Sequence, residues 1–280
     1  MASKPIVISI QGDTSGLSKA LKGARGKLKD FGKSVGKFGV TSGAVFAATA
    51  TAAATKGIFA FSDFEKGMKE VMTLLPDAGD TVFGELSDQV KDFSKEFGVL
   101  PDEVIPSLYQ SISAGVPKDS VFEFLEVSTK AAKGGLTDLS VAVDGISSVV
   151  NSYGSEIISA TEASDLMFTA VKLGKTDFNQ LSTELYKVAP IAASLGIDFG
   201  AVTASLANLT AKGVPTAQAA TQLKAAFAEL GKEGTKADKA FRELSGKSLT
   251  DFLKGGGKFE DALIMMKEGA DKAGVSVLDM

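Results

Sequence analysis

Two stretches of the sequence, AGVPKDSVFEFL at residues 114–125 and KGVPTAQAATQL at residues 212–223, contain the same Gly-Val-Pro turn 98 residues apart. Each turn follows an apolar run with helical spacing and precedes another such run. Glycine suits the left-handed residue that ends a helix, and proline suits the start of the next one. The pair therefore predicts a helical protein in which a helix–turn–helix unit occurs twice.

A shift of 98 residues aligns more than the two turns. Across the pairs from Phe97/Leu195 to Val127/Ala225, eight of 31 positions are identical, and in the first copy these are Gly98, Val104, Ser107, Leu108, Gly115, Val116, Pro117 and Leu125. This predicts an internal duplication of the helix–turn–helix unit. The alternative is convergence on a common way of ending one helix and starting another.

Amphipathic helices are predicted from Phe59 onward, because apolar residues recur there every three or four positions. Glycines end these runs at intervals of 17 to 22 residues, at Gly98, Gly115, Gly135, Gly154, Gly174, Gly196 and Gly213. We expect these glycines to be left-handed residues past helix ends. Four apolar residues that follow them should pack back on the last turn, namely Val99, Leu136, Ile197 and Val214.

Helix starts are predicted directly after these glycines. The signals are Thr137-Asp138, Thr176-Asp177, Pro215-Thr216 and a capping box of Ser159 with Glu162. The helices should have roughly 12 to 15 residues, and the short connections predict antiparallel or orthogonal neighbours.

The first 57 residues have a different character. Residues 5–13, PIVISIQGD, alternate in the manner of a β-strand. A heptad seam follows, formed by Leu17, Leu21, Ala24, Leu28, Phe31, Val35 and Phe38. It predicts either a coiled coil between several copies or an amphipathic helix docked on its own domain. Residues 38–55 carry no charge, which favours a tightly packed helix, with a membrane-active segment as the alternative.

The charge is distributed unevenly. Residues 1–56 hold nine Lys and Arg against two Asp, a net charge of +7, so the remainder must carry −11 to give the total of −4. Arg25, Lys29, Lys33 and Lys37 form a basic stripe. Such a basic segment indicates either a partner or a solvated helix face.

We predict a mainly α protein with three regions. Residues 1–57 form the short strand, the long glycine-containing amphipathic or coiled-coil helix and the uncharged segment. Residues 58–231 form a bundle of short helices joined by glycine turns, with the duplicated unit inside it. Residues 232–280 form a looser helical extension, and the apolar residues near its end predict a new element and therefore a fragment of a longer chain.

The composition disfavours an enzyme. The chain has no Cys and no His, which removes thiolate nucleophiles, the usual general base and the commonest zinc ligands. Asp138 is interpreted as an acid in the first turn of a helix and Asp144 as a surface acid, rather than as a calcium site. The pair Asp102-Glu103 is interpreted as complementing a helix N-terminus rather than as a catalytic pair. Gly246-Lys247-Ser248 does not follow a strand and does not fit a phosphate-binding loop. Met265 and Met266, with Ile264, are interpreted as core residues. We therefore predict no catalytic residues, no cofactor and no metal; a carboxylate-dependent hydrolase stays the enzymatic alternative.

Five segments together make up well over half of residues 64–227: FEKGMKEV (64–71), KEFGVLPDEVIPSLYQSISAGV (95–116), GGLTDLSVAVDGISSVVNSYG (134–154), ASDLMFTAVKLGKTDFNQLSTELYKVAPIAASLGI (163–197) and LANLTAKGVPTAQAATQLKAAF (206–227). In this order they resemble the core region of phage tail tape measure proteins. The family's core has no agreed catalytic residues, so the resemblance assigns none here.

The resemblance implies a helical protein, present in several copies, that sets the length of the tail tube during assembly and leaves ahead of the DNA. It implies self-association into a helical bundle and contacts with tail tube protein, tail assembly chaperones and tail tip or baseplate proteins. A host membrane during ejection and non-specific DNA are further expected contacts. The expected location is the tail tube lumen of the virion, with the host cytoplasm during assembly. The alternative is a membrane-active or pore-forming helical protein acting in genome delivery through residues 38–61.

Overall fold

The computed structural model describes residues 63–76 and 79–274. The chain divides into two compact units, Met1–Asp63 and Phe64–Met280, and the described residues lie almost entirely in the second. The predicted strand at 5–13, the heptad helix and the uncharged segment at 38–55 fall outside the described residues. Within them every regular element is a helix, which confirms the mainly α class.

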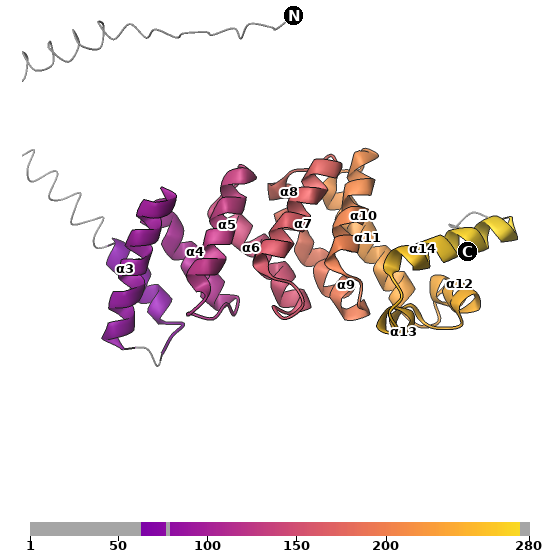
Figure 1. The fold of residues 1–280 in the computed structure, drawn as a ribbon, viewed down its shortest axis with the longest axis horizontal. Helices are drawn as coiled ribbons and strands as arrows, with labels where there is room; N and C mark the ends of the chain where they lie inside the picture. The colour runs from indigo at the N-terminus through magenta and orange to yellow at the C-terminus, as the bar shows by residue number, and fades with distance from the viewer. Residues whose placement is uncertain (1–62, 77–78, 275–280) are drawn as a thin grey trace, which may run out of the picture. The chain divides into compact units, whose positions relative to one another are not determined.

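The helices follow one another through short connections (Figure 1). Residues 63–72 form the first described helix, and the elements after it are α3 (Asp80–Phe97), α4 (Pro101–Ser113), α5 (Val121–Gly134), α6 (Leu139–Tyr153), α7 (Ala160–Leu173), α8 (Phe178–Glu184), the 3₁₀ turn η1 (Leu185–Lys187), α9 (Ala189–Leu195), α10 (Phe199–Ala211), α11 (Thr216–Gly231), α12 (Lys236–Ser245), α13 (Leu249–Lys254) and α14 (Phe259–Ala273).

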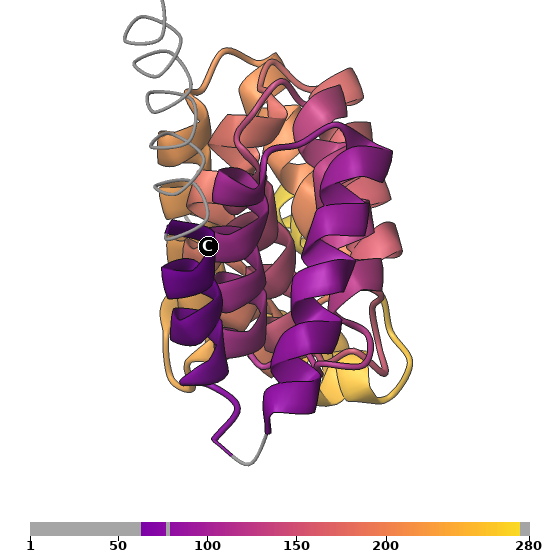
Figure 2. The same cartoon turned by 90° about the vertical axis from the view of Figure 1, so that its left-hand side faces the viewer.

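Helix α6 is at the centre of the packing in this unit. It contacts α4, α5, α7, α8, η1 and α9. One row contains α4, α6 and α8 with α9, and a second row contains α5, α7 and α10. Seen from the α3 side, the later helices lie behind the earlier ones (Figure 2). The buried residues of α6 include Val143, Ile146 and Val149, all fully shielded from solvent, because this helix has neighbours on several sides.

The two Gly-Val-Pro turns have the same backbone geometry. Gly115 and Gly213 have φ angles of 90° and 92°. The Val116 N–H donates to the Ser111 carbonyl at 3.0 Å, and the Val214 N–H donates to the Leu209 carbonyl at 3.2 Å. These bonds satisfy carbonyl groups that the helix end leaves free.

The two turns nevertheless lie at opposite ends of α6. The first turn adjoins the C-terminal end of α6, where Asn151 Nδ2 donates to the Ala114 carbonyl at 2.7 Å. The second adjoins the start of α8, where Thr216 Oγ1 donates to Gln180 Oε1 at 2.9 Å. The start of α8 in turn adjoins the N-terminal end of α6, through a hydrogen bond of 2.7 Å from Asn179 Nδ2 to Thr137 Oγ1.

Two of the predicted left-handed glycines are not left-handed. Gly135 has a φ of −89° and Gly174 a φ of −101°. Both are sites of close approach instead: a Cβ on Gly135 would lie 2.5 Å from Phe178 Cβ, and one on Gly174 would lie 2.4 Å from Thr210 Oγ1. The left-handed residue after α5 is Leu136, with a φ of 51°, so its side chain is 93% exposed and the prediction that it packs back on the helix is wrong.

At the other predicted turns, the glycine has a positive φ and the apolar residue after it is at least half-buried where one was predicted to pack. Gly98 and Gly196 end α3 and α9 in the left-handed conformation, and Gly154 has a φ of 92°. Ile197 is fully buried, and Val99 and Val214 are half-buried against the core. Helix starts also form where predicted, since Asp177 Oδ1 accepts from the Gln180 N–H at 2.8 Å and Ser159 Oγ accepts from the Glu162 N–H at 3.1 Å.

Candidate functional site

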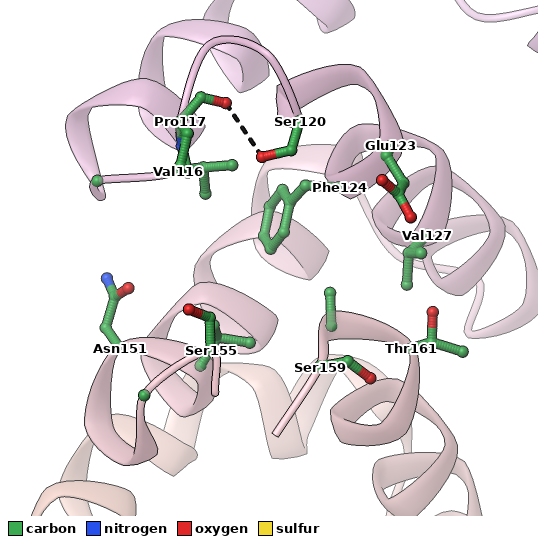
Figure 3. A pocket seen from close by; sticks show the side chains of 14 residues that line it. Val116, Pro117, Ser120, Glu123, Phe124, Val127, Asn151, Ser155, Ser159 and Thr161 are labelled. Atoms are coloured by element: carbon green, nitrogen blue, oxygen red, sulfur yellow. Dashed lines mark hydrogen bonds between the residues drawn. The ribbon is translucent and has the colours of Figure 1, made fainter. Parts of the chain in front are cut away.

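A cavity with a volume of about 450 Å³ lies beside the first Gly-Val-Pro turn. Its walls come from that turn, from α5, from the C-terminal end of α6 and from the N-terminal end of α7 (Figure 3). Phe124, which is 7% exposed, provides apolar surface together with Val116 and Val127. The turn therefore shapes the cavity as well as joining two helices.

The polar groups of this cavity are hydroxyls, one amide and one carboxylate. Ser120 Oγ donates to the Pro117 carbonyl at 3.3 Å within the turn. Glu123 is the only titratable residue among the lining residues. A serine or threonine nucleophile needs an adjacent base, and hydrolysis by paired carboxylates needs two acids, so the lining holds neither arrangement.

A second cavity continues the first along the groove between α5 and α7. It has a volume of about 220 Å³ and shares Val127 and Thr161 with its neighbour. Its other lining residues include Lys130, Asp165 and Phe168. The groove thus combines apolar surface with charges of both signs.

Three acids that the sequence placed at separate helix ends are neighbours in the structure. Asp102 and Glu103 of the first turn of α4 and Asp138, the N-cap residue of α6, line one cavity of about 240 Å³. Each acid also lies where a helix N-terminus favours negative charge. Asp144 is exposed on α6 and is absent from this cavity. Within the described residues no group of three acids is placed to hold a metal ion.

Gly246, Lys247 and Ser248 form a connection between two helices. Gly246 has a φ of 73° and ends α12, while Ser248 is the N-cap residue of α13 and accepts from the Asp251 N–H at 3.1 Å. No strand precedes this segment in residues 63–76 or 79–274. Of the predicted core residues nearby, Met266 is buried and Met265 half-buried, but Ile264 is 54% exposed and its assignment to the core is wrong.

Asp238 is a buried acid that was not predicted from the sequence. It is 3% exposed, and its carboxylate accepts from the Gly234 N–H at 2.9 Å and from Arg242 Nε at 2.8 Å. The Gly234 N–H is the main cause of the lowered pKa of Asp238, and Arg242 adds to it. The signal that could have found it is Thr235 three residues earlier, since Thr235 Oγ1 accepts from the Asp238 N–H as in a capping box. The role of this acid is structural, because its partners all belong to the same turn and helix.

Tyr153 has a buried hydroxyl group with no hydrogen-bond partner among the described residues. Its ring packs edge-on against Phe199, with 5.8 Å between the ring centroids. Burial raises the pKa of the Tyr153 hydroxyl, and the negative charge of Asp198 raises it further. The group is therefore protonated at neutral pH.

None of the helices that the structure describes has both the length and the apolar character that crossing a membrane requires. The segment at 38–61, which would carry the alternative membrane activity, lies outside the described residues.

Comparison with known proteins identifies the family. A model of the phage-related minor tail protein family matches residues 87–275. The chain is 31% identical over 231 residues to the probable tape measure protein of Clostridium phage phiCD119, an alignment that covers 78% of this chain and 24% of that protein. It is 23% identical over 187 residues to the tape measure protein of Pneumococcus phage Dp-1, covering 65% of this chain and 16% of that protein.

The chain therefore spans less than a quarter of the length of these two relatives. No solved structure matches it. Neither relative is named as a pore-forming protein, so the membrane-active alternative gains no support. The resemblance to tape measure proteins is confirmed, and the chain belongs to the phage-related minor tail protein family.

Proposed function

We propose that this chain belongs to a tape measure protein that sets the length of the tail tube during assembly and leaves the particle ahead of the DNA. The observation that carries the proposal is the family match across residues 87–275, which covers most of the described helices. The absence of Cys and His from the sequence agrees with a structural role in the tail.

The proposed partners are other copies of the chain, tail tube protein, tail assembly chaperones and tail tip or baseplate proteins. The net charge of +7 in residues 1–56 supports an acidic partner for that segment. Contact with DNA would be non-specific, and contact with the host membrane would occur during ejection. The proposed location is the tail tube lumen in the virion, and the host cytoplasm during assembly.

The described helices bear on how length is measured. A single α-helix advances about 1.5 Å per residue. Helices α3 to α7 instead reverse direction at each connection, and packed helices lie about 8–10 Å apart. Because α4 packs on α6 and α5 packs on α7, two successive helices share one such step, and five helices made from roughly 99 residues advance about 20–25 Å, against about 150 Å for the same residues in one straight helix. We propose that this folded unit anchors and packs the tape measure and adds little to its length.

Deletion of residues 75–173 from the phage gene tests this proposal. Tail lengths in electron micrographs should shorten by about 20–25 Å if the unit stays folded in the tail, and by about 150 Å if it is stretched into straight helices. The wild-type gene supplied on a plasmid is the control and should restore the original length. Tails of unchanged length would contradict any contribution of these residues to measurement.

A further inference from the structure

The helices of the described unit recur in the same order at a nearly constant offset. Helix α3 spans Asp80–Phe97, and α8, η1 and α9 together span Phe178–Leu195, so both limits differ by 98 residues. Helix α4 spans Pro101–Ser113 and α10 spans Phe199–Ala211, again 98 residues apart at both limits. The correspondence therefore extends beyond the Gly-Val-Pro turn to the whole preceding element.

The offset continues on both sides of these helices. Helix α5 ends at Gly134 and α11 at Gly231, and α6 starts at Leu139 and α12 at Lys236, each pair 97 residues apart. Helix α7 starts at Ala160 and α14 at Phe259, 99 residues apart. Residues 63–72 form a helix in the position that precedes α3, as α7 precedes α8.

Buried side chains follow the same offset. Met68, Met167 and Met266 are spaced by 99 residues, lie on residues 63–72, α7 and α14, and are 0%, 0% and 7% exposed. Val104 and Val202 are both fully buried, and Leu108 and Leu206 are 0% and 1% exposed. Equivalent helices therefore turn the same positions toward the core.

Backbone details at the helix ends also match. The Val99 N–H donates to the Ser94 carbonyl, and 98 residues later the Ile197 N–H donates to the Ala192 carbonyl. Leu136, the only residue other than glycine with a positive φ in the described residues, lies in the connection that corresponds to the one holding Gly234, which has a φ of 82° and lies one residue nearer the next N-cap. A common way of ending one helix explains one such match, but it does not explain matched limits for two consecutive elements followed by helices that end or start at nearly the same offset.

We propose that the described unit is a tandem array of a five-helix module of about 98 residues. The first module contains the helix at 63–72, α3, α4, α5 and α6. The second contains α7, the group α8–η1–α9, α10, α11 and the pair α12 and α13. Helix α14 occupies the first position of a third module. Because the number of helices is odd, each module is inverted relative to the one before it. This inversion explains why the two Gly-Val-Pro turns lie at opposite ends of α6.

The two modules differ most in their last element. Helix α6 is continuous for 15 residues, whereas α12 ends after 10 residues at the left-handed Gly246. The contact between α4 and α6 has no prominent counterpart between α10 and α12. The contacts of α5 with α6 and of α6 with α7 do recur, as α11 with α12 and α12 with α14. The array thus keeps its order while the second module is less tightly closed.

Two deletions from the purified chain test the module. Deletion of residues 75–173 removes one module and joins Leu74 to Gly174, so that the helix at 63–72 takes the place of α7. The matched control is deletion of residues 75–153, which joins Leu74 to Gly154 and removes four helices. The helix at 63–72 then takes the place of α6. It can run in the direction of α6, but its buried side chains do not match the positions that α6 buries. The first variant should unfold cooperatively in urea, with an m-value reduced in proportion to its length, although it retains fewer native residues than the control.

A second pair of variants removes no helix. Residues 98–116 are replaced by residues 196–214, which is the proposed register, or by residues 194–212, which shifts every buried position by two. The first replacement should keep cooperative unfolding, and the second should lose it. The proposal requires the two variants of each pair to differ in the cooperativity of unfolding. If the two variants of either pair are both folded or both unfolded, the proposal is overturned. These readouts concern folding alone and do not depend on the proposed role in the tail.

Discussion

Gly145 in the middle of α6 lies directly against Ser182 of α8, so closely that a Cβ on Gly145 would be 2.6 Å from the Ser182 hydroxyl oxygen. Real Cβ atoms do not approach other atoms to this distance, so one of the two helices would have to move. We predict that Gly145→Ala destabilises the protein by about 1–3 kcal/mol, the usual cost of overpacking a core. Urea unfolding followed by circular dichroism measures the change.

Gly84 is the matched control for Gly145, because it also lies inside a helix but has no atom within 4 Å of a built Cβ. Gly84→Ala should stabilise α3 by about 0.5–1 kcal/mol, since glycine is a poor helix former. If both substitutions stabilise the protein, the contact between α6 and α8 is looser than the structure has it.

Replacement of Leu136 by glycine should stabilise the protein. A left-handed conformation costs a residue with a Cβ roughly 1–2 kcal/mol, and the exposed side chain of Leu136 contributes little packing in return. Allowing for the extra freedom of glycine in the unfolded chain, Leu136→Gly should stabilise the protein by about 0.5–1 kcal/mol. Gly234→Leu, in the corresponding connection of the second module, is the reciprocal control and should destabilise it by about 1 kcal/mol. A loss of stability in Leu136→Gly would show that the leucine makes a stabilising contact.

The raised pKa of the Tyr153 hydroxyl predicts a loss of stability at alkaline pH. The pKa of its hydroxyl is raised in the folded protein, so above the ordinary value of 10.0 the unfolded chain releases a proton that the folded chain retains. The unfolded state then binds fewer protons, and the free energy of unfolding falls as the pH rises. Unfolding measured from about pH 9 to 11 should show this fall in the parent and a smaller one in Tyr153→Phe. Tyr186→Phe, which alters a largely exposed tyrosine, should leave it unchanged.

The lowered pKa of Asp238 predicts a loss of stability at acidic pH. Its pKa is lowered in the folded state, so its contribution is complete above the ordinary value of 3.8 and is lost as the pH falls through the lower folded value. Asp238→Asn should therefore destabilise the protein at neutral pH by about 1–3 kcal/mol, and the difference from the parent should shrink below pH 3.8. Asp88→Asn, which breaks an exposed pair with Lys91, should change stability by less than about 1 kcal/mol. A constant difference at all pH values would mean that the charge of Asp238 does not contribute.

The helices and the Gly-Val-Pro turns were predictable because their signals are local. Apolar spacing and a glycine followed by Val-Pro act within a few residues, and the structure has helices on both sides of each turn. The predictions for Gly135 and Gly174 were wrong for a physical reason. A glycine that allows close approach and a glycine that adopts a positive φ are the same residue in the sequence, and only the partners Phe178 and Thr210 distinguish them.

The cavity beside Gly115 was not predictable. Its walls come from the α4–α5 connection, α5, α6 and α7, so it depends on how non-adjacent helices pack rather than on any motif. The cluster of Asp102, Glu103 and Asp138 depends likewise on the contact between α4 and α6. Asp238 is different, since the Thr235–Asp238 spacing was visible in the sequence.

The alternation of helix direction has a mechanical consequence. Each helix between α3 and α7 packs against its neighbours in the chain and against the helix next but one, so a pull on one end of this segment first loads the contacts of the terminal helix alone. Contacts that separate in succession yield at a lower force than contacts sheared together. A protein drawn lengthwise through a narrow tube would therefore unravel helix by helix, and the energy needed at any moment would be that of detaching one helix from the two that it packs on.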